Sequence, residues 1–241
     1  MASIQYRGER QTNLVRPISA GPKMNSKMSS LVICGTDTEV GKTIVSALLV
    51  QGLNAHYWKP IQSGLDGGGD RGRIHRLLNL PSERCISEIY AFHAPVSPHW
   101  AAEQENCLIE PELLKLPTVP SPIILETAGG LMVPLNRQWL QIDQLQLWKL
   151  PVVLVARSGL GTLNHTLLSL EALRIRNIRV LGLVLNGPPH ADNPTTLEQL
   201  GGVPIIAKLP ILRHLTAQAL QEQWEKQQLR ATFQKLLEPW E

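Results

Sequence analysis

The chain has 241 residues, of which 43% are hydrophobic, and a formal net charge of +3. This length allows one large α/β domain with a real core, and the small, scattered positive charge argues against nucleic acid or an anionic membrane as the main partner. Three cysteines without a CxxC pair predict reduced thiols and a cytoplasmic protein, and no apolar run reaches the roughly 20 residues of a membrane-spanning helix.

Residues 1–28 differ from the rest of the chain. They contain neither an apolar stretch nor a periodic pattern, so they lack the centre of a secretory signal. We expect a disordered extension here. Residues 29–241 contain no linker and no internal repeat, and they are predicted to form a single P-loop α/β domain.

Short, nearly continuous apolar runs recur along this domain, and each is followed by Gly, Pro or polar residues and then by a helix-like stretch. The runs are LVIC (31–34), HYWKP (56–60), SPIILE (121–126), LPVVLVA (150–156), RVLGLVLN (179–186) and VPIIAK (203–208). Continuous apolar strands separated by helices, such as TLNHTLLSLEALRIR (162–176), predict a doubly wound, mostly parallel sheet with helices on both faces. The glycine-rich GLDGGGDRGR (64–73) is predicted to be a mobile loop.

The strand ends carry the residues of chemical interest, because open α/β sheets bind ligands at the carboxyl ends of their strands. Distinctive polar or glycine-containing segments follow five of the predicted strands. They are residues 35–43, 59–64, 126–130, 159–165 and 186–187.

The first of these segments, GTDTEVGKT, resembles a phosphate-binding loop in which the opening glycine is displaced to Gly35. It lies between a predicted strand and a predicted helix, so its backbone N–H groups can hold phosphate oxygens. Lys42 would reach the outer phosphates and the Thr43 hydroxyl would bind Mg²⁺. The predicted nucleotide contacts in this segment are Glu39, Val40, Gly41, Lys42, Thr43 and Ile44.

Carboxylates are expected beside this loop to hold the metal. Glu126 follows an apolar run in IILETAGG, as an acidic residue does in a Walker B strand, and Asp66 or Asp70 would supply a second carboxylate. Asp37 stands where partitioning-type ATPases carry their signature lysine, which counts against a nucleotide-switch ATPase.

Six motifs in order, GTDTEVGKT, YWKPIQSG, SPHWAA, ETAGG, GLGTLNHTLLS and LGLVLNG, closely resemble the ATP-dependent dethiobiotin synthetase family. The resemblance covers about residues 31–212. It implies a reaction in which 7,8-diaminopelargonic acid takes up CO2 as a carbamate, ATP phosphorylates the carbamate, and the second amine closes the ureido ring with loss of phosphate. ATP is then a co-substrate and Mg²⁺ the cofactor.

The resemblance also assigns roles to individual residues. Lys59, with Lys42, would act on the carbamate and the transferred phosphoryl group, and Ser63 would hydrogen-bond the substrate. Metal binding falls to Thr43, Asp70 and Glu126, with Asp66 open as an alternative to Asp70. The segment around Asn186 and Gly187 would read the adenine edge, Pro210 and Leu212 would line the base pocket, and Gly161 and Asn164 would hold the substrate carboxylate.

In this family the carboxylate site reaches in from a partner subunit, so the resemblance implies a homodimer with sites at the interface. Two alternatives stay open from the residues alone. One is an amidase-type synthetase of a corrin precursor, which would need a glutaminase domain that about 30 residues after Leu212 cannot form. The other is a partitioning-type switch ATPase.

Overall fold

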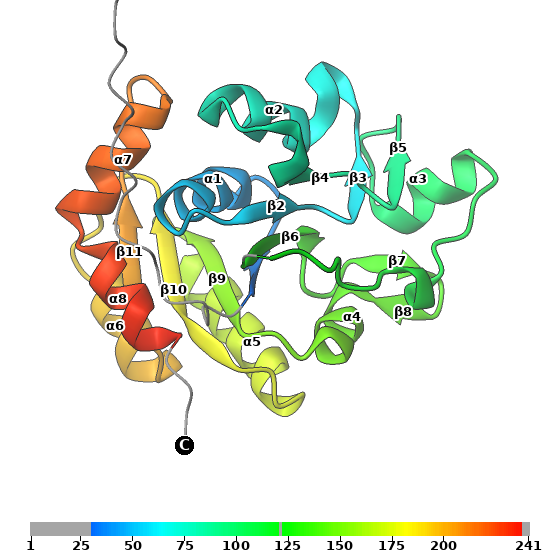
Figure 1. Ribbon diagram of the computed structural model, residues 1–241. Coiled ribbons are helices and arrows are strands. Elements are labelled where there is room, and N and C mark those ends of the chain that lie inside the picture. The colour runs from blue at the N-terminus through cyan, green and yellow to red at the C-terminus, as the bar shows by residue number, and fades with distance from the viewer. Residues whose placement is uncertain (1–29, 121, 238–241) are drawn as a thin grey trace, which may run out of the picture.

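The computed structural model describes residues 30–120 and 122–237 (Figure 1). The extension predicted over residues 1–28 lies outside the described residues. A seven-stranded sheet forms the centre, in the order β11-β10-β9-β1-β6-β2-β4, and every pairing in it is parallel. Its strands are β1 (Leu31–Gly35), β2 (His56–Trp58), β4 (Cys85–Ile86), β6 (Ile123–Gly130), β9 (Val152–Arg157), β10 (Val180–Asn186) and β11 (Ile205–Leu209).

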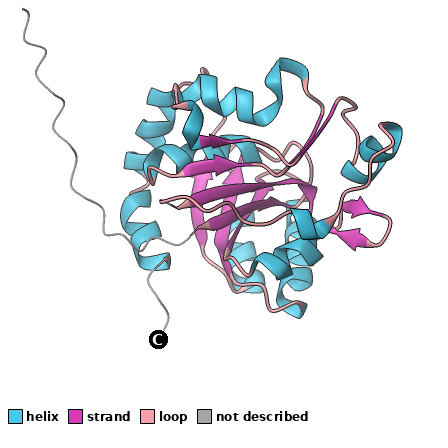
Figure 2. Cartoon of the chain, turned by 45° about the vertical axis from the view of Figure 1, so that its right-hand side comes forward, coloured by secondary structure: helices cyan, strands magenta, loops and turns pink. Residues whose placement is uncertain are grey.

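Two small ribbons lie beside this sheet. β3 (Ile61–Ser63) pairs with β5 (Tyr90–Phe92), and β7 (Pro134–Asn136) pairs with β8 (Trp139–Leu140). The helices are α1 (Lys42–Gly52), α2 (Gly69–Leu78), α3 (Pro98–Gln104), α4 (Gln141–Trp148), α5 (Thr162–Ile175), α6 (Asn193–Gly201), α7 (Ala217–Lys226) and α8 (Leu229–Leu236). Figure 2 shows the sheet enclosed by helices. None of the helices in the described ranges is both long and apolar enough to cross a bilayer.

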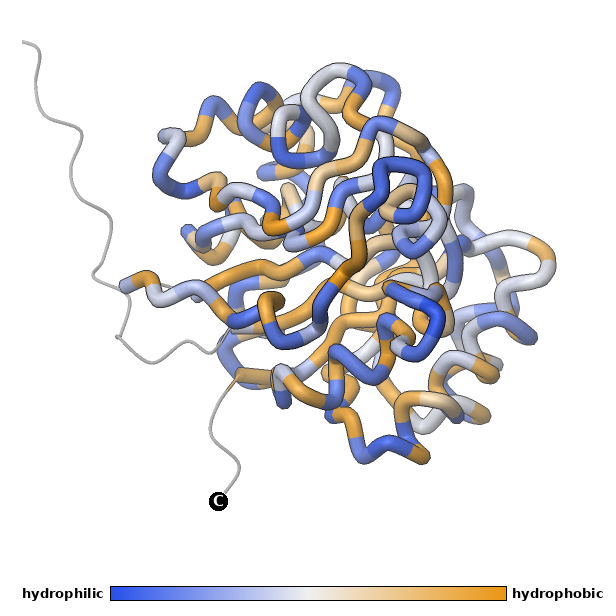
Figure 3. Tube along the Cα trace, turned by 90° about the vertical axis from the view of Figure 1, so that its right-hand side faces the viewer, coloured by the Kyte–Doolittle hydropathy of each residue, from blue (hydrophilic) through white to orange (hydrophobic). Residues whose placement is uncertain are grey.

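Both faces of the sheet are buried, as the continuous apolar runs predicted. In β1, Leu31 and Ile33 belong to one hydrophobic cluster, while Val32 and Cys34 belong to a second. Alternate side chains of a strand point to opposite faces, so these two clusters are the two sides of the sheet. Helices α1, α7 and α8 cover the first side, and α4, α5 and α6 contribute to the second. The apolar segments run through the interior in Figure 3, and the prediction of a doubly wound α/β fold is confirmed.

Helix α7 packs against α1, and α8 packs against α7. The rings of Trp224 and Phe233 stack with centroids 6.0 Å apart, and both residues are buried. A Cβ atom on Gly52 would lie 2.4 Å from the Trp224 ring, so the ring fills the space that a larger residue would need. The amide of Gln51 donates to the backbone oxygen of Ala217 at 3.1 Å. These contacts fix the end of the described chain to the helix that begins at the phosphate loop.

The prediction of a mobile loop over residues 64–73 was wrong. A 3-10 turn occupies Asp66–Gly68, and α2 begins at Gly69. Gly68 is the N-cap of α2 and has a φ of 81°, which glycine adopts without strain. The glycines that favour a loop in the sequence therefore include the residue at which this helix starts. Burial of Ile74, and a hydrogen bond from Arg76 to the Gly67 oxygen at 2.6 Å, stabilise the segment. Tertiary contacts therefore outweigh the low helix propensity of its glycines.

Candidate active site

The phosphate loop connects β1 to α1. Gly41 precedes the helix with a φ of 95°, and a Cβ atom there would lie 1.9 Å from the amide nitrogen of Asn186. Only glycine fits this position, since both the backbone conformation and the neighbouring amide exclude a side chain. The same Asn186 amide donates to the Val40 oxygen at 3.1 Å and so links the end of β10 to the phosphate loop. Lys42, which is 7% exposed, donates from Nζ to the Asp37 oxygen at 2.8 Å and lies across the loop.

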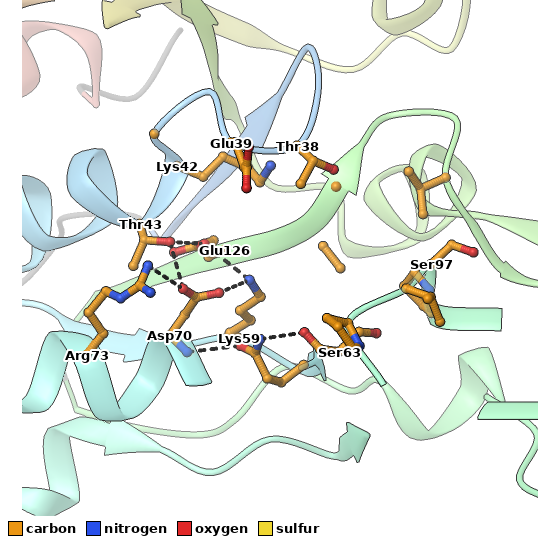
Figure 4. Close-up of a pocket in the computed structure, with 18 of the residues that line it drawn as sticks. Thr38, Glu39, Lys42, Thr43, Lys59, Ser63, Asp70, Arg73, Ser97 and Glu126 are labelled. Carbon is orange, nitrogen blue, oxygen red and sulfur yellow. Dashed lines mark hydrogen bonds and ion pairs between the residues drawn. The ribbon is translucent and has the colours of Figure 1, made fainter. Parts of the chain in front are cut away.

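Four predicted residues from four separate segments meet beside this loop (Figure 4). The Thr43 hydroxyl lies 3.1 Å from Asp70 Oδ1 and 2.9 Å from Glu126 Oε1. Lys59 Nζ donates to Asp70 Oδ2, and to Glu126 Oε1 at 3.3 Å. Thr43 lies in the first turn of α1, Lys59 follows β2, Asp70 lies in the first turn of α2 and Glu126 lies within β6. We call these four residues the ion cluster.

The three charged side chains of the ion cluster are largely buried, with exposures of 8% for Lys59, 16% for Asp70 and 1% for Glu126, and burial strengthens their electrostatics. Burial by itself lowers the pKa of Lys59, but the carboxylates of Glu126 and Asp70 outweigh it, so this pKa is raised. Burial favours the neutral form of Asp70, yet the neighbouring Lys59 lowers the pKa of that carboxyl. Burial also lowers the pKa of Lys42, against the attraction of Glu126. Lys59 and Asp70 therefore remain ionised at neutral pH.

A cavity of about 620 Å³ opens above the ion cluster. Ser63 Oγ is buried there and has no hydrogen-bond partner in the described part of the chain, so a polar atom is available to a ligand. The predicted residues that line this cavity are Glu39, Gly41, Lys42, Thr43, Ile44, Lys59, Ser63, Asp70 and Glu126. Val40, in contrast, is buried in the core. Asp66 is exposed and lies outside the cavity, whereas Asp70 lines it.

The remaining predicted residues lie outside this cavity. Gly187 donates its N–H to the Leu209 oxygen at 2.9 Å, which places it between the ends of β10 and β11. Leu212 packs partly buried against the core, and Pro210 lies just before it in the chain. Gly161 and Asn164, at the start of α5, are both exposed. Their roles stay predictions.

The ion cluster also suits Mg²⁺ by its chemistry. Mg²⁺ in nucleotide sites takes one or two carboxylates together with substrate phosphates, rather than a cage made wholly of protein ligands. Two carboxylates and a threonine hydroxyl converge here beside the phosphate loop. No group of three or more His, Cys, Asp and Glu suited to a metal occurs among the described residues.

Three residues that contact the polar groups of the site were not predicted. Tyr57 is fully buried and donates to Glu126 Oε2 at 3.0 Å, and burial and Glu126 raise its pKa well above the ordinary value. Gln62 accepts from the Asp70 N–H at 3.1 Å and donates to the Ser63 oxygen, so it joins two site segments. Arg73 lines the cavity 3.6 Å from Asp70. The sequence gives no signal for the role of Tyr57, because a tyrosine within an apolar run is most simply a core residue.

Comparison with known proteins gives the family. A protein-family model described as an AAA domain matches residues 29–219. The ATP-dependent dethiobiotin synthetase of Rhodopseudomonas palustris (strain BisB5) is 45% identical over 205 residues, which cover 85% of this chain and 97% of the relative. The chain belongs to the ATP-dependent dethiobiotin synthetase family. The resemblance in the six motifs is thereby confirmed.

Two further comparisons concern a longer relative and a solved structure of low sequence identity. The biotin biosynthesis bifunctional protein BioCD of Bordetella avium (strain 197N) is 48% identical over 202 residues; the match covers 83% of this chain and 43% of that longer relative. Among solved structures, the septum site-determining protein MinD from Pyrococcus horikoshii OT3, complexed with Mg-ADP, gives a TM-score of 0.53 at 14% identity. That match covers 86% of this chain and 94% of the other, and it shows a shared fold alone.

Proposed function

We propose that the chain forms dethiobiotin from 7,8-diaminopelargonic acid, CO2 and ATP, with Mg²⁺ as cofactor. One amine adds to CO2 and gives a carbamate, whose oxygen attacks the γ-phosphorus of ATP and releases ADP. The second amine then attacks the carbonyl carbon of the carbamic-phosphoric anhydride, and phosphate leaves as the ureido ring closes. The observation that carries this proposal is the ion cluster, which sets a buried lysine beside a phosphate loop and two carboxylates.

Each cation of the site has a separate task in this reaction. Lys42 neutralises the outer phosphates, and Mg²⁺, when bound, would neutralise phosphate charge from the side of Thr43, Asp70 and Glu126. Lys59 stabilises the charge that develops between carbamate and phosphoryl group, and this kind of positioned charge is most of phosphoryl-transfer catalysis. The unpartnered Ser63 hydroxyl, which faces the same cavity, binds the carbamate or an amine.

The proposal includes a homodimer in which each site uses both subunits. Three large apolar side chains are exposed near the start of α5 and the loop after β6, namely Leu160 (100% exposed), Leu168 (62%) and Met132 (55%). A second hollow of about 380 Å³ lies there, lined by Met132 and Leu168 together with Asp37 of the phosphate loop. Covering this surface with a second copy would bring Gly161 and Asn164 of one subunit toward the other subunit's site. The enzyme would work in the cytoplasm.

A direct assay tests the reaction. Purified protein is mixed with Mg-ATP, bicarbonate and 7,8-diaminopelargonic acid, and dethiobiotin is sought by mass spectrometry. We expect product, and ATP hydrolysis only when the diamine is present. Steady ATP hydrolysis without diamine and without product would instead favour a partitioning-type switch ATPase, while amide formation on a corrin precursor would favour the amidase-type synthetase.

Mixed dimers test the shared site. Lys59→Gln damages the reacting centre and Asn164→Ala damages the proposed carboxylate receptor, so one site in a mixed dimer would be intact. We expect mixing of the two variants to restore part of the activity. A fully active monomer would contradict the shared-site arrangement, as would failure to complement in dimers shown to exchange subunits.

A further inference from the structure

The two carboxylate oxygens of Glu126 have different partners. Oε1 faces the ion cluster, where Thr43 lies at 2.9 Å and Lys59 at 3.3 Å. Oε2 instead accepts the hydrogen bond of the Tyr57 hydroxyl at 3.0 Å. Glu126 is 1% exposed and Tyr57 is 0% exposed, so water does not compete for this bond.

The strands fix this contact. β2 and β6 are parallel neighbours in which Tyr57 is paired with Ile124, and Glu126 follows Ile124 by two residues. Two residues along a strand is one full repeat, so the side chain of Glu126 emerges on the same face as that of Tyr57. The phenol ring is packed in the cluster on the α1 side of the sheet. The strand pairing and the packing of the ring therefore hold the Tyr57 hydroxyl beside Glu126 Oε2.

The last torsion of a glutamate side chain has no sharp preference, so an unheld carboxylate would present either oxygen, or neither, to the site. We propose that Tyr57 is a positioning residue for Glu126, and that its hydroxyl holds Oε2 so that Oε1 is presented to Mg²⁺-nucleotide and to Lys59. This inference rests on the proposed function, in which Mg²⁺ and ATP bind at the ion cluster. Removing the hydroxyl leaves a buried carboxylate oxygen without its donor and free to turn, both of which weaken metal binding.

The variant Tyr57→Phe tests the proposal, because it deletes only the hydroxyl and keeps the ring in the core. Binding of a non-hydrolysable ATP analogue is measured by titration calorimetry, once with excess Mg²⁺ and once with EDTA. We expect the affinity in EDTA to equal that of the wild type, and the gain in affinity from Mg²⁺ to fall about tenfold, which corresponds to roughly 1.4 kcal/mol. Tyr90→Phe is the matched control, since it removes a phenol hydroxyl bonded to the Glu110 N–H outside the ion cluster and should change neither value.

A double variant separates positioning from packing. If Tyr57 acts through Glu126, then Tyr57→Phe should add no further loss of the Mg²⁺ gain to Glu126→Gln. Three results would each overturn the inference. They are an unchanged gain in nucleotide affinity from Mg²⁺ in Tyr57→Phe, an equal loss of nucleotide affinity in EDTA, and additive losses of the Mg²⁺ gain in the double variant. Failure of the proposed function has a different signature, namely normal Mg²⁺-dependent nucleotide binding by the wild type without formation of dethiobiotin.

Discussion

The variant Lys59→Gln should distinguish two roles of the Lys59 charge, which are to stabilise the fold and to stabilise the transition state. Glutamine keeps much of the length and the hydrogen bonding of lysine but removes the cation that two carboxylates share. The side chains of Lys59, Asp70 and Glu126 are only 8%, 16% and 1% exposed, so solvent cannot compensate. Removing one partner of a buried ion pair costs about 3–5 kcal/mol. We expect the free energy of unfolding, measured by urea denaturation without Mg²⁺, to fall by roughly that amount.

Mg²⁺ and nucleotide should restore part of this stability, because a bound cation replaces the charge that Lys59→Gln deletes. Catalysis should not be restored. If the lysine charge acts on the transferred phosphoryl group, kcat should fall at least about 100-fold, which is roughly 2.7 kcal/mol of transition-state stabilisation. The KM for ATP should change much less.

Steady-state kinetics at varied ATP concentration give kcat and the KM for ATP. Lys115→Gln, at an exposed lysine, is the matched control. A Lys59→Gln variant with normal kcat and weakened ATP binding would show that the lysine anchors phosphate. A variant as stable as the wild type without Mg²⁺ would show that Lys59 does not hold the two carboxylates together.

Thr43→Val should keep the fold but lose Mg²⁺-dependent turnover, since it removes the hydroxyl that faces both carboxylates; unchanged activity would exclude Thr43 from the metal site. Gly52→Ala should lower the free energy of unfolding by about 1–3 kcal/mol, because its Cβ atom meets the ring of Trp224, and urea denaturation checks this. Asn164→Ala should raise the KM for the diamine and leave that for ATP nearly unchanged, and equal changes in both would remove it from the carboxylate site. The pKa of Asp70 is lowered on folding, so its stabilisation is present above its ordinary pKa of 3.8 and is lost as the pH falls through the lower folded value. Asp70→Asn should remove that part of the acid dependence measured by denaturation, and an unchanged dependence would contradict it.

The sequence predicted the sheet well, because parallel strands buried on both faces appear as continuous apolar runs. β1, β9 and β10 start and end within about two residues of the predicted runs. It also predicted which polar residues meet, since the carboxyl ends of parallel strands converge at one edge. Lys59 and Glu126 are far apart in the chain and yet 3.3 Å apart in space.

Other features could not be predicted because they depend on tertiary contacts. Helix α2 begins in a run of glycines that local propensity assigns to a loop, and it is stabilised by contacts that Asp70 and Ile74 make elsewhere. Tyr57 lies within an apolar run, where a buried tyrosine is most simply a core residue, and only its pairing with Glu126 shows otherwise. The role proposed for Asn164 depends on a second subunit, which the fold of one chain does not describe.

The place of β1 in the sheet has a consequence for synthesis on the ribosome. β1 is the first strand of the sheet to be made, and it is also flanked on both edges, with Leu31 paired to Ile124 and Val32 paired to Val152. Both neighbours are translated long after it, because parallel pairing requires distant segments. The apolar stretch LVICG therefore emerges without a partner on either edge and remains so until β6 and then β9 have left the exit tunnel. During that interval the nascent chain exposes an unpaired apolar strand, which is the kind of segment that is prone to aggregate and that chaperones bind.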